Sequence, residues 1–184
     1  MSTKQVAIFY GSTTCYTEMA SEKIQLQLEK LFSQADQSVD VAMFDIKEHS
    51  LEKSTHYDLV IYGISTWDFG ELQEDWESTW EDIKTLRLAD KTVALFGLGD
   101  QLGYADWFQD ALGMLHDELI ILDCNIIGYW PNEGYEFTAS KALSEDEAFF
   151  VGLSLDDENQ FELSDQRIEQ WCKQLVEEWE SDSQ

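Results

Sequence analysis

The chain has 184 residues, of which 38 are Asp or Glu and only 11 are Lys or Arg, which gives a formal charge of -27. This acidic excess excludes a nucleic-acid-binding protein, because affinity for a phosphate backbone comes from clustered Lys and Arg. A hydrophobic fraction of 43% with 10 Phe, 7 Tyr and 7 Trp also excludes a disordered acidic tail, which lacks the apolar surface that offsets chain entropy.

The length predicts one domain over residues 1–184, since a chain of this size buries roughly 70% of its unfolded surface around a single core. Near the N-terminus only Val6 to Tyr10 form an apolar run, so we expect neither a secretion signal nor a membrane span. Cys15, Cys124 and Cys172 have no paired spacing, which favours reduced thiols in a cytoplasmic protein. We expect no metal site, because no ligand motif occurs.

The first half of the chain predicts strands that alternate with a helix. Gln5 to Tyr10 is an apolar run that suits a strand buried on both faces. An amphipathic helix is predicted from Glu18, and its apolar stripe recurs every three or four residues. The members of that stripe are Met19, Ala20, Ile24, Leu28 and Leu31. Two further strands are predicted over Val39 to Asp45 and Leu59 to Ser65, while residues 51–58 between them have no clear period.

The alternation continues in the second half of the chain. A helix is predicted from about Asp75, a strand over Thr92 to Leu98, a helix from about Ala105 and a last helix that carries Ile168 and Trp179 on its apolar stripe. Such alternation predicts a parallel sheet with helices on both faces.

The fifth strand is predicted to be interrupted. It begins at Asn125 to Trp130, but Pro131 to Gly134 breaks the pattern, and an apolar run resumes only at Phe149 to Leu155. We interpret the intervening residues, 131–150, as an excursion inserted into the last strand.

Ligands of an open parallel sheet bind beyond the carboxyl ends of its strands, where the strand order reverses. Three loops meet this condition, over residues 11–17, 65–70 and 97–104; we call them the first, second and third loops. The first loop contains four hydroxyl residues at a strand-to-helix turn, where free amides and the helix dipole favour a phosphate. Its alternative reading is an ordinary helix N-cap, for which one hydroxyl would suffice.

The second and third loops each carry an aromatic residue just past a buried strand, Trp67 and Tyr104. Two such rings on adjacent strand ends can sandwich a flat cofactor, with Asp100 and nearby amides at its polar edge. The alternative for either ring alone is packing on its own helix. A nucleotide-triphosphate loop is excluded because no Gly-Lys-Ser/Thr occurs, and Gly97, Gly99 and Gly103 are spaced wrongly for a dinucleotide fingerprint.

These motifs resemble the long-chain flavodoxins over nearly the whole chain, and the Cys-Tyr-Thr-Glu form of the first loop is most similar to the bacterial flavodoxin B subgroup. The resemblance rests on Phe9 to Thr14, Ser65 to Glu71, Gly97 to Tyr104 and Gly128 to Pro131. It implies a three-layer α/β/α fold of the flavodoxin type, with a five-stranded parallel sheet in the order 2-1-3-4-5. It also implies bound FMN.

Specific residues are implied to bind FMN by the same resemblance. Ser12, Thr13, Thr14 and Thr17 would hold its phosphate together with the amides through Cys15 and Tyr16. Trp67 and Tyr104 would flank the ring, the Asp68–Phe69–Gly70 backbone would lie beside flavin N5, and Asp100 with neighbouring backbone would bind the pyrimidine end. The remaining implied contacts are Ser65, Thr66, Leu98, Gly99 and Gln101.

The first loop departs from the usual family pattern. Ser12 stands where the family usually has Thr, and Cys15 stands where it has glycine, so a side chain occupies a position at which glycine relaxes the backbone. Phosphate binding is expected to survive. Cys15 is interpreted either as a thiol activated by the helix N-terminus or as an unreactive thiol shielded by cofactor.

Acidic residues gather at the predicted flavin edge, since residues 65–83 contain seven acids and no base. A carboxylate at roughly 8 Å opposes an added electron by about 2 kcal/mol at an effective dielectric near 20. We therefore predict a low-potential one-electron carrier that cycles between semiquinone and hydroquinone, although such a run is more often only a solvated face.

Three functions are weighed. The first is an electron carrier, not an enzyme, that an NADPH-dependent flavodoxin or ferredoxin reductase reduces and that passes electrons to acceptor redox enzymes through its acidic face. The second is an FMN-dependent quinone-reductase-type enzyme on the same fold, and the third is an acidic interaction module without FMN. The carrier is expected to be a monomer that binds neither nucleic acid nor membrane.

Overall fold

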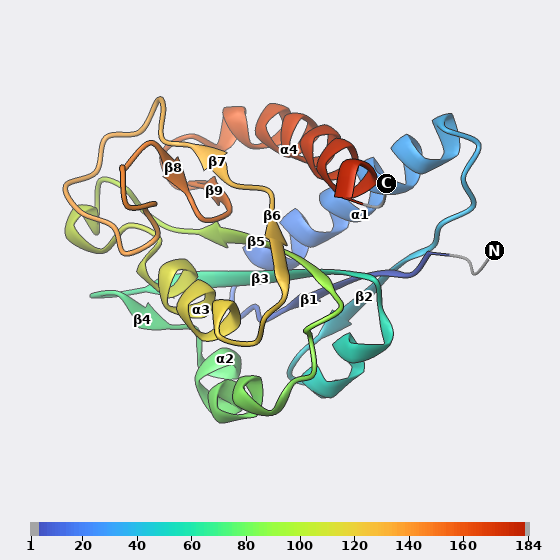
Figure 1. The fold of residues 1–184 in the computed structure, drawn as a ribbon. Helices are drawn as coiled ribbons and strands as arrows, with labels where there is room; N and C mark the ends of the chain where they lie inside the picture. The colour runs from blue at the N-terminus through green and yellow to red at the C-terminus, as the bar shows by residue number, and fades with distance from the viewer. Residues whose placement is uncertain (1–3, 183–184) are drawn as a thin grey trace.

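A parallel β-sheet forms the middle layer of the molecule in the computed structural model, which describes residues 4–182 (Figure 1). Its strands are β1 (Val6–Tyr10), β2 (Val41–Asp45), β3 (Leu59–Trp67), β5 (Thr92–Leu98), β6 (Asn125–Ile127) and β9 (Leu153–Leu155). They run in the order β2-β1-β3-β5, with β6 and β9 following β5 at the edge. The predicted order 2-1-3-4-5 is therefore confirmed.

The last strand position is filled by two separate segments, as predicted. The amino half of β5 pairs with β6, from Thr92 opposite Asn125 to Ala94 opposite Ile127. The carboxyl half pairs with β9 instead, starting with Phe96 opposite Leu153. The chain between them forms a small antiparallel hairpin of β7 (Trp130–Pro131) and β8 (Phe149–Phe150).

Helices cover both faces of the sheet (Figure 1). The long helices α1 (Tyr16–Gln34) and α4 (Phe161–Asp182) lie side by side on one face, and the shorter α2 (Glu74–Thr79) and α3 (Asp110–Ile120) cover the other. Short 3₁₀ turns make up η1 (Leu51–His56), η2 (Trp80–Thr85) and η3 (Ala105–Trp107). The segment without a clear period in the sequence is thus η1.

Two predicted helices differ from the observed ones. The helix expected from Asp75 changes to 3₁₀ geometry at Trp80, although Trp76 and Ile83 are both buried. The helix expected from Ala105 is interrupted by Gln109, whose φ is 62°. The buried Gln109 side chain donates to the carbonyls of Gly97 and Leu155, both at 3.1 Å, so tertiary hydrogen bonds override a continuous helix here.

The core lies between the sheet and these helices. Every residue of β1 is buried, which agrees with a strand covered on both faces. On the predicted stripe of α1, Ala20, Ile24 and Leu28 are buried, but Met19 is 42% exposed, so the stripe begins one residue later than expected. Within residues 4–182 no helix combines the length and the apolar character needed to cross a membrane.

The excursion between β6 and β9 packs against the chain around η3, directly after the third loop. Thr138 and Ala139 donate their amides to the carbonyl of Ala105, and Phe108 donates its amide to the carbonyl of Ala139. Phe108 also contacts the rings of Tyr135, Phe137 and Phe150. The excursion therefore supports the chain that follows the third loop.

Candidate functional site

The three predicted loops meet around one hollow at the carboxyl end of the sheet, with a volume of about 310 Å³. Parallel strands that end at the same edge bring residues far apart in sequence together there. The lining residues that the sequence predicted are Thr14, Tyr16, Ser65, Thr66, Trp67, Asp68, Leu98, Gly99, Asp100 and Tyr104. Asp157 and Glu158 also line the hollow and were not predicted.

The first loop leaves the N-terminus of α1 uncapped. Cys15 precedes the helix and makes no side-chain cap. Its φ of 68° lies in the left-handed region that glycine favours, so the backbone keeps this conformation although the residue has a side chain. Ser12 Oγ is buried and has no hydrogen-bond partner within the described chain. Thr17 is almost fully buried and its hydroxyl lies 2.5 Å from that of Ser65, which ties the first loop to β3.

Thr13 connects the first loop to the opposite layer. Its hydroxyl accepts a hydrogen bond from Gln73 Nε2 at 3.1 Å and donates to Glu74 at 3.3 Å. The Gln73 side chain also caps α2 by accepting from the amide of Trp76. The loop is thus fixed by neutral side chains and one carboxylate, and no Lys or Arg takes part in these bonds.

The second loop is tighter than predicted, because β3 continues through Ser65, Thr66 and Trp67 before the chain turns. Only Asp68, Phe69 and Gly70 form the turn, and β4 (Glu71–Leu72) then pairs antiparallel with the end of β3. Asp68 and Gly70 adopt positive φ angles of 40° and 86°. Trp67 is therefore held by a strand, which is a more rigid support than a loop.

The third loop is shaped by its own carboxylate. Asp100 Oδ1 accepts hydrogen bonds from the amides of Leu102 at 3.1 Å and Gly103 at 2.7 Å, and from Asn159 Nδ2 at 2.8 Å. Partial burial acts to raise the pKa of Asp100, but the bonds from Gly103, Asn159 and Leu102 outweigh it and hold the pKa below its usual value. The carboxylate therefore stays ionised beside the hollow.

Aromatic rings connect the second and third loops beside the hollow. The Phe69 ring meets Tyr104 edge-on at a centroid distance of 6.2 Å and Trp107 at 5.1 Å. Phe69 itself is 66% exposed, so it bridges the two loops at the surface. The ring of Tyr104 thus contacts a neighbouring loop, which differs from packing on its own helix.

The two unpredicted lining residues follow β9. Burial raises the pKa of Asp157, although a hydrogen bond from the Ser164 hydroxyl and the charge of Lys23 act in the opposite direction. Glu158 is exposed. The signal that could have found them is the polar run Asp156 to Asn159 directly after the last apolar run, at the same end of the sheet as the three loops.

The remaining predicted residues lie around the hollow rather than in its wall. Ser12, Thr13, Cys15 and Thr17 form the turn behind Thr14 and Tyr16, and Gly70 lies against Trp107 and Asp110. Gln101 is only 1% exposed because its side chain turns inward to Asp156. Direct contact of these residues with a ligand stays a prediction.

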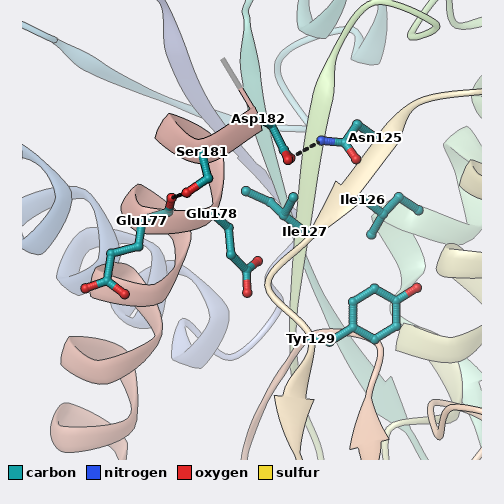
Figure 2. Close-up of a pocket in the computed structure, with 8 residues that line it drawn as sticks. All are labelled: Asn125, Ile126, Ile127, Tyr129, Glu177, Glu178, Ser181 and Asp182. Atoms are coloured by element: carbon teal, nitrogen blue, oxygen red, sulfur yellow. Dashed lines mark hydrogen bonds between the residues drawn. The ribbon is translucent and has the colours of Figure 1, made fainter. Parts of the chain in front are cut away.

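A second hollow lies near the amino ends of the strands, between β6 and the end of α4 (Figure 2). Asn125 closes part of it with a 2.7 Å hydrogen bond to Asp182, and Glu177 and Glu178 add negative charge. Tyr129 of the Gly128 to Pro131 motif lines it, but none of the three loops contributes a lining residue. Within residues 4–182, no group of three or more His, Cys, Asp or Glu side chains is arranged to hold a metal ion.

The geometry of the second loop makes Gly70 sensitive to substitution. We expect Gly70→Ala to lower the free energy of unfolding by about 1–3 kcal/mol, because an alanine is strained at the φ of 86° that Gly70 adopts. A comparable further loss of about 1–3 kcal/mol is expected from crowding, because a Cβ would lie 2.9 Å from Asp110 Oδ2. Gly134→Ala is the matched control, since Gly134 has a φ of 80° but its nearest neighbour would be 3.9 Å away. Equal losses in urea unfolding would contradict the crowding argument.

Comparison with known proteins agrees with this architecture. A family model described as flavodoxin matches residues 8–171. Flavodoxin 2 of Escherichia coli (strain K12) is 51% identical over 173 residues, which cover 94% of this chain and 95% of that protein. A flavodoxin of Haemophilus influenzae is 42% identical over 173 residues and covers 94% of each chain.

The fold also matches solved structures. A Fusobacterium nucleatum flavodoxin bound to flavin mononucleotide superposes with a TM-score of 0.85, covering 95% of this chain and 98% of that one, at 24% sequence identity. At that identity the likeness concerns the fold alone. The family model and the sequence identity to curated relatives together place this chain in the flavodoxin family.

Proposed function

We propose that the protein binds FMN in the hollow between the three loops and works as a low-potential one-electron carrier. Membership of the flavodoxin family makes it an electron-transfer flavoprotein rather than an enzyme. The observation that carries the proposal is the position of Trp67 and Tyr104, which both line a hollow next to the uncapped N-terminus of α1. When bound, FMN supplies the redox chemistry, because it can hold one or two electrons.

The residues of the first loop fit a phosphate group. Ser12 Oγ is a buried polar atom without a partner, and the first amides of α1 lack a side-chain cap. A helix N-terminus with free amides and hydroxyls binds a phosphate without a cation. Ser12, the Thr14 side chain and the amides through Tyr16 are the groups that we propose to hold it, while Thr17 and Ser65 keep the turn in place.

The two other loops fit a flat ring with one polar edge. Trp67 and Tyr104 would cover its faces, and the backbone of Gly99 and Asp100 would meet the polar edge. The Asp68–Gly70 turn supplies backbone groups at the opposite side, and glycine at position 70 permits the positive φ that this turn adopts. Tyr104 lines the hollow and its ring contacts Phe69, so it would cover the ring face at which a quinone-reductase-type enzyme would take its substrate.

The charges around the hollow support a low potential. Asp68, Asp100, Asp157 and Glu158 line it, and no Lys or Arg does. These carboxylates oppose the accumulation of further negative charge in the hollow, so the second electron becomes hard to add.

We propose an NADPH-dependent flavodoxin or ferredoxin reductase as electron donor and acceptor redox enzymes as recipients. The support is an acidic surface next to the hollow, formed by Asp68, Glu71, Glu74 and Glu77 around Thr13 and Trp67. Such a surface attracts basic faces of partners and gives salt-dependent encounter rates. We further propose a single domain over residues 1–184 that acts as a monomer in the cytoplasm, which suits three free cysteines and one continuous core.

An anaerobic titration tests the carrier function. Purified protein should bind added FMN, and stepwise reduction should produce a long-wavelength absorption band at half reduction that disappears when reduction is complete. Bleaching in a single two-electron step, or direct oxidation of NAD(P)H by the protein, would contradict the proposal. Failure to bind FMN would contradict it as well and would favour the acidic interaction module.

A further inference from the structure

Asp156 is a fully buried carboxylate that lies behind the hollow and not in its wall. It directly follows β9 and is 0% exposed. No ion pair to Asp156 occurs among residues 4–182, so its charge is held by neutral donors alone. Burying a carboxylate without a cation costs several kcal/mol unless hydrogen bonds compensate. An apolar residue at this position would avoid the free-energy cost of desolvating a carboxylate, which indicates a specific task for the charge.

The donors to Asp156 come from the third loop and from the turn after β9. Oδ2 accepts from the Gln101 amide at 3.0 Å and from Gln101 Nε2 at 2.8 Å. Oδ1 accepts from the Asn159 amide at 3.1 Å and from Asn159 Nδ2 at 3.0 Å. Gln101 Oε1 in turn accepts from the amide of Glu136, which joins the excursion to the same network. Charge-assisted bonds of this kind are stronger than neutral ones.

Asn159 extends the network to the carboxylate that shapes the third loop. The same Nδ2 group that contacts Asp156 lies 2.8 Å from Asp100 Oδ1. Asp100 Oδ1 also holds the amides of Leu102 and Gly103. The backbone of the third loop is therefore fastened at two points, through Gln101 to Asp156 and through Asp100 to Asn159.

The hydrogen bonds of the third loop leave one amide free. The Gly99 amide donates to Leu155, Gln101 to Asp156, Leu102 and Gly103 to the Asp100 side chain, and Tyr104 to the Asp100 carbonyl. Of the amides from residue 99 to residue 104, all of which the structure describes, only that of Asp100 has no acceptor. Asp100 lines the hollow. The network thus leaves a single N–H among residues 99–104 available to donate to a ligand.

We propose that Asp156 is a positioning residue, which acts through Gln101 and Asn159 to present the Asp100 amide to the polar edge of the FMN ring. This inference rests on the proposed FMN site. It assigns different tasks to the two ends of the hollow: the first loop binds the phosphate independently, whereas affinity for the ring depends on the Asp156 network.

Asp156→Asn tests the proposal with little change in volume. The new amide places donors where Gln101 and Asn159 already donate, so at least one of the two attachments is lost. We expect the dissociation constants of FMN and of riboflavin, which lacks the phosphate, to rise by the same factor of at least ten. The affinity of the apo-protein for inorganic phosphate should stay within twofold of wild type. Asp165→Asn is the matched control, because it removes an exposed acid of α4 outside the network.

Asn159→Ala keeps the test decisive if Asp156→Asn folds poorly. Asn159 is exposed, so its truncation should leave folding intact while it breaks the connection between Asp156 and Asp100. We expect a smaller loss, about threefold to tenfold, for FMN and riboflavin alike, with phosphate affinity unchanged.

Several results would overturn the inference. Wild-type affinity for riboflavin in both variants would show that the network does not position the loop. An equal loss for riboflavin and inorganic phosphate would indicate a general structural defect instead. Failure of the wild-type chain to bind FMN would contradict the proposed function and, with it, this inference, whereas normal wild-type binding with unaffected variants would contradict the inference alone.

Discussion

Replacing Trp76 with alanine is expected to lower the free energy of unfolding by about 3–5 kcal/mol, the usual cost of removing a large buried aromatic side chain. Trp76 is 0% exposed and packs edge-on against Tyr62 with ring centroids 5.9 Å apart. Its Nε1 donates to the carbonyl of Gly63 at 2.8 Å, within β3. The substitution therefore removes packing and a buried hydrogen bond at once, beneath the strand that carries Trp67.

Urea unfolding of the apo-protein measures this effect. Trp80→Ala is the control, because Trp80 is only half-buried and should cost clearly less. Trp76→Phe separates the two contributions, since it keeps most of the ring and loses the donor to Gly63, at an expected cost of about 1–3 kcal/mol. A loss below 1 kcal/mol for Trp76→Ala would show that the α2 layer contributes little to the core.

The second large effect concerns the redox potential. Neutralising Asp68 and Glu158 together should make the second electron easier to add, because both side chains line the hollow and their charges oppose it. Each carboxylate contributes up to about 2 kcal/mol at roughly 8 Å and an effective dielectric near 20, and less where solvent screens it. The midpoint potential of that step should therefore rise in Asp68→Asn/Glu158→Gln protein.

Spectroelectrochemistry at low and high salt distinguishes this field effect from a change in structure. The rise should shrink as ionic strength increases, since both residues are exposed. Glu177→Gln is the matched control, because Glu177 lies by the second hollow at the other end of the sheet (Figure 2). A potential that does not change, or a control that shifts as far, would contradict an electrostatic origin.

Much of the fold follows from periodicity, because buried parallel strands are short and almost wholly apolar. The strand predicted over Thr92 to Leu98 matches β5 at both ends, and the interruption of the last strand is visible as the break at Pro131. The 3₁₀ turns and the hairpin of β3 with β4 were missed. The break between η3 and α3 depends on the tertiary hydrogen bonds of Gln109, which no local pattern encodes.

The candidate site could be predicted where the chain itself marks a strand end. Trp67 and Tyr104 each stand just past an apolar run and line the hollow. Asp157 and Glu158 were missed because only three strand ends were considered as ligand loops, and the polar run after Phe149 to Leu155 was not among them. Asp156 could not have been assigned at all from sequence, since its task depends on Gln101 and Asn159 lying beside it in space.

The divided last strand also separates two demands on this edge of the molecule. The sheet needs only six residues beside β5, and β6 and β9 supply them whatever the length of chain between them. Residues of the excursion are therefore not constrained by the pairing of the parallel sheet. They instead support the chain after the third loop, through Ala105 and Phe108. Changes in these residues can alter the edge of the molecule beside the third loop without changing the pairing of any strand of the parallel sheet, so the shape of this edge and the sheet are free to vary separately.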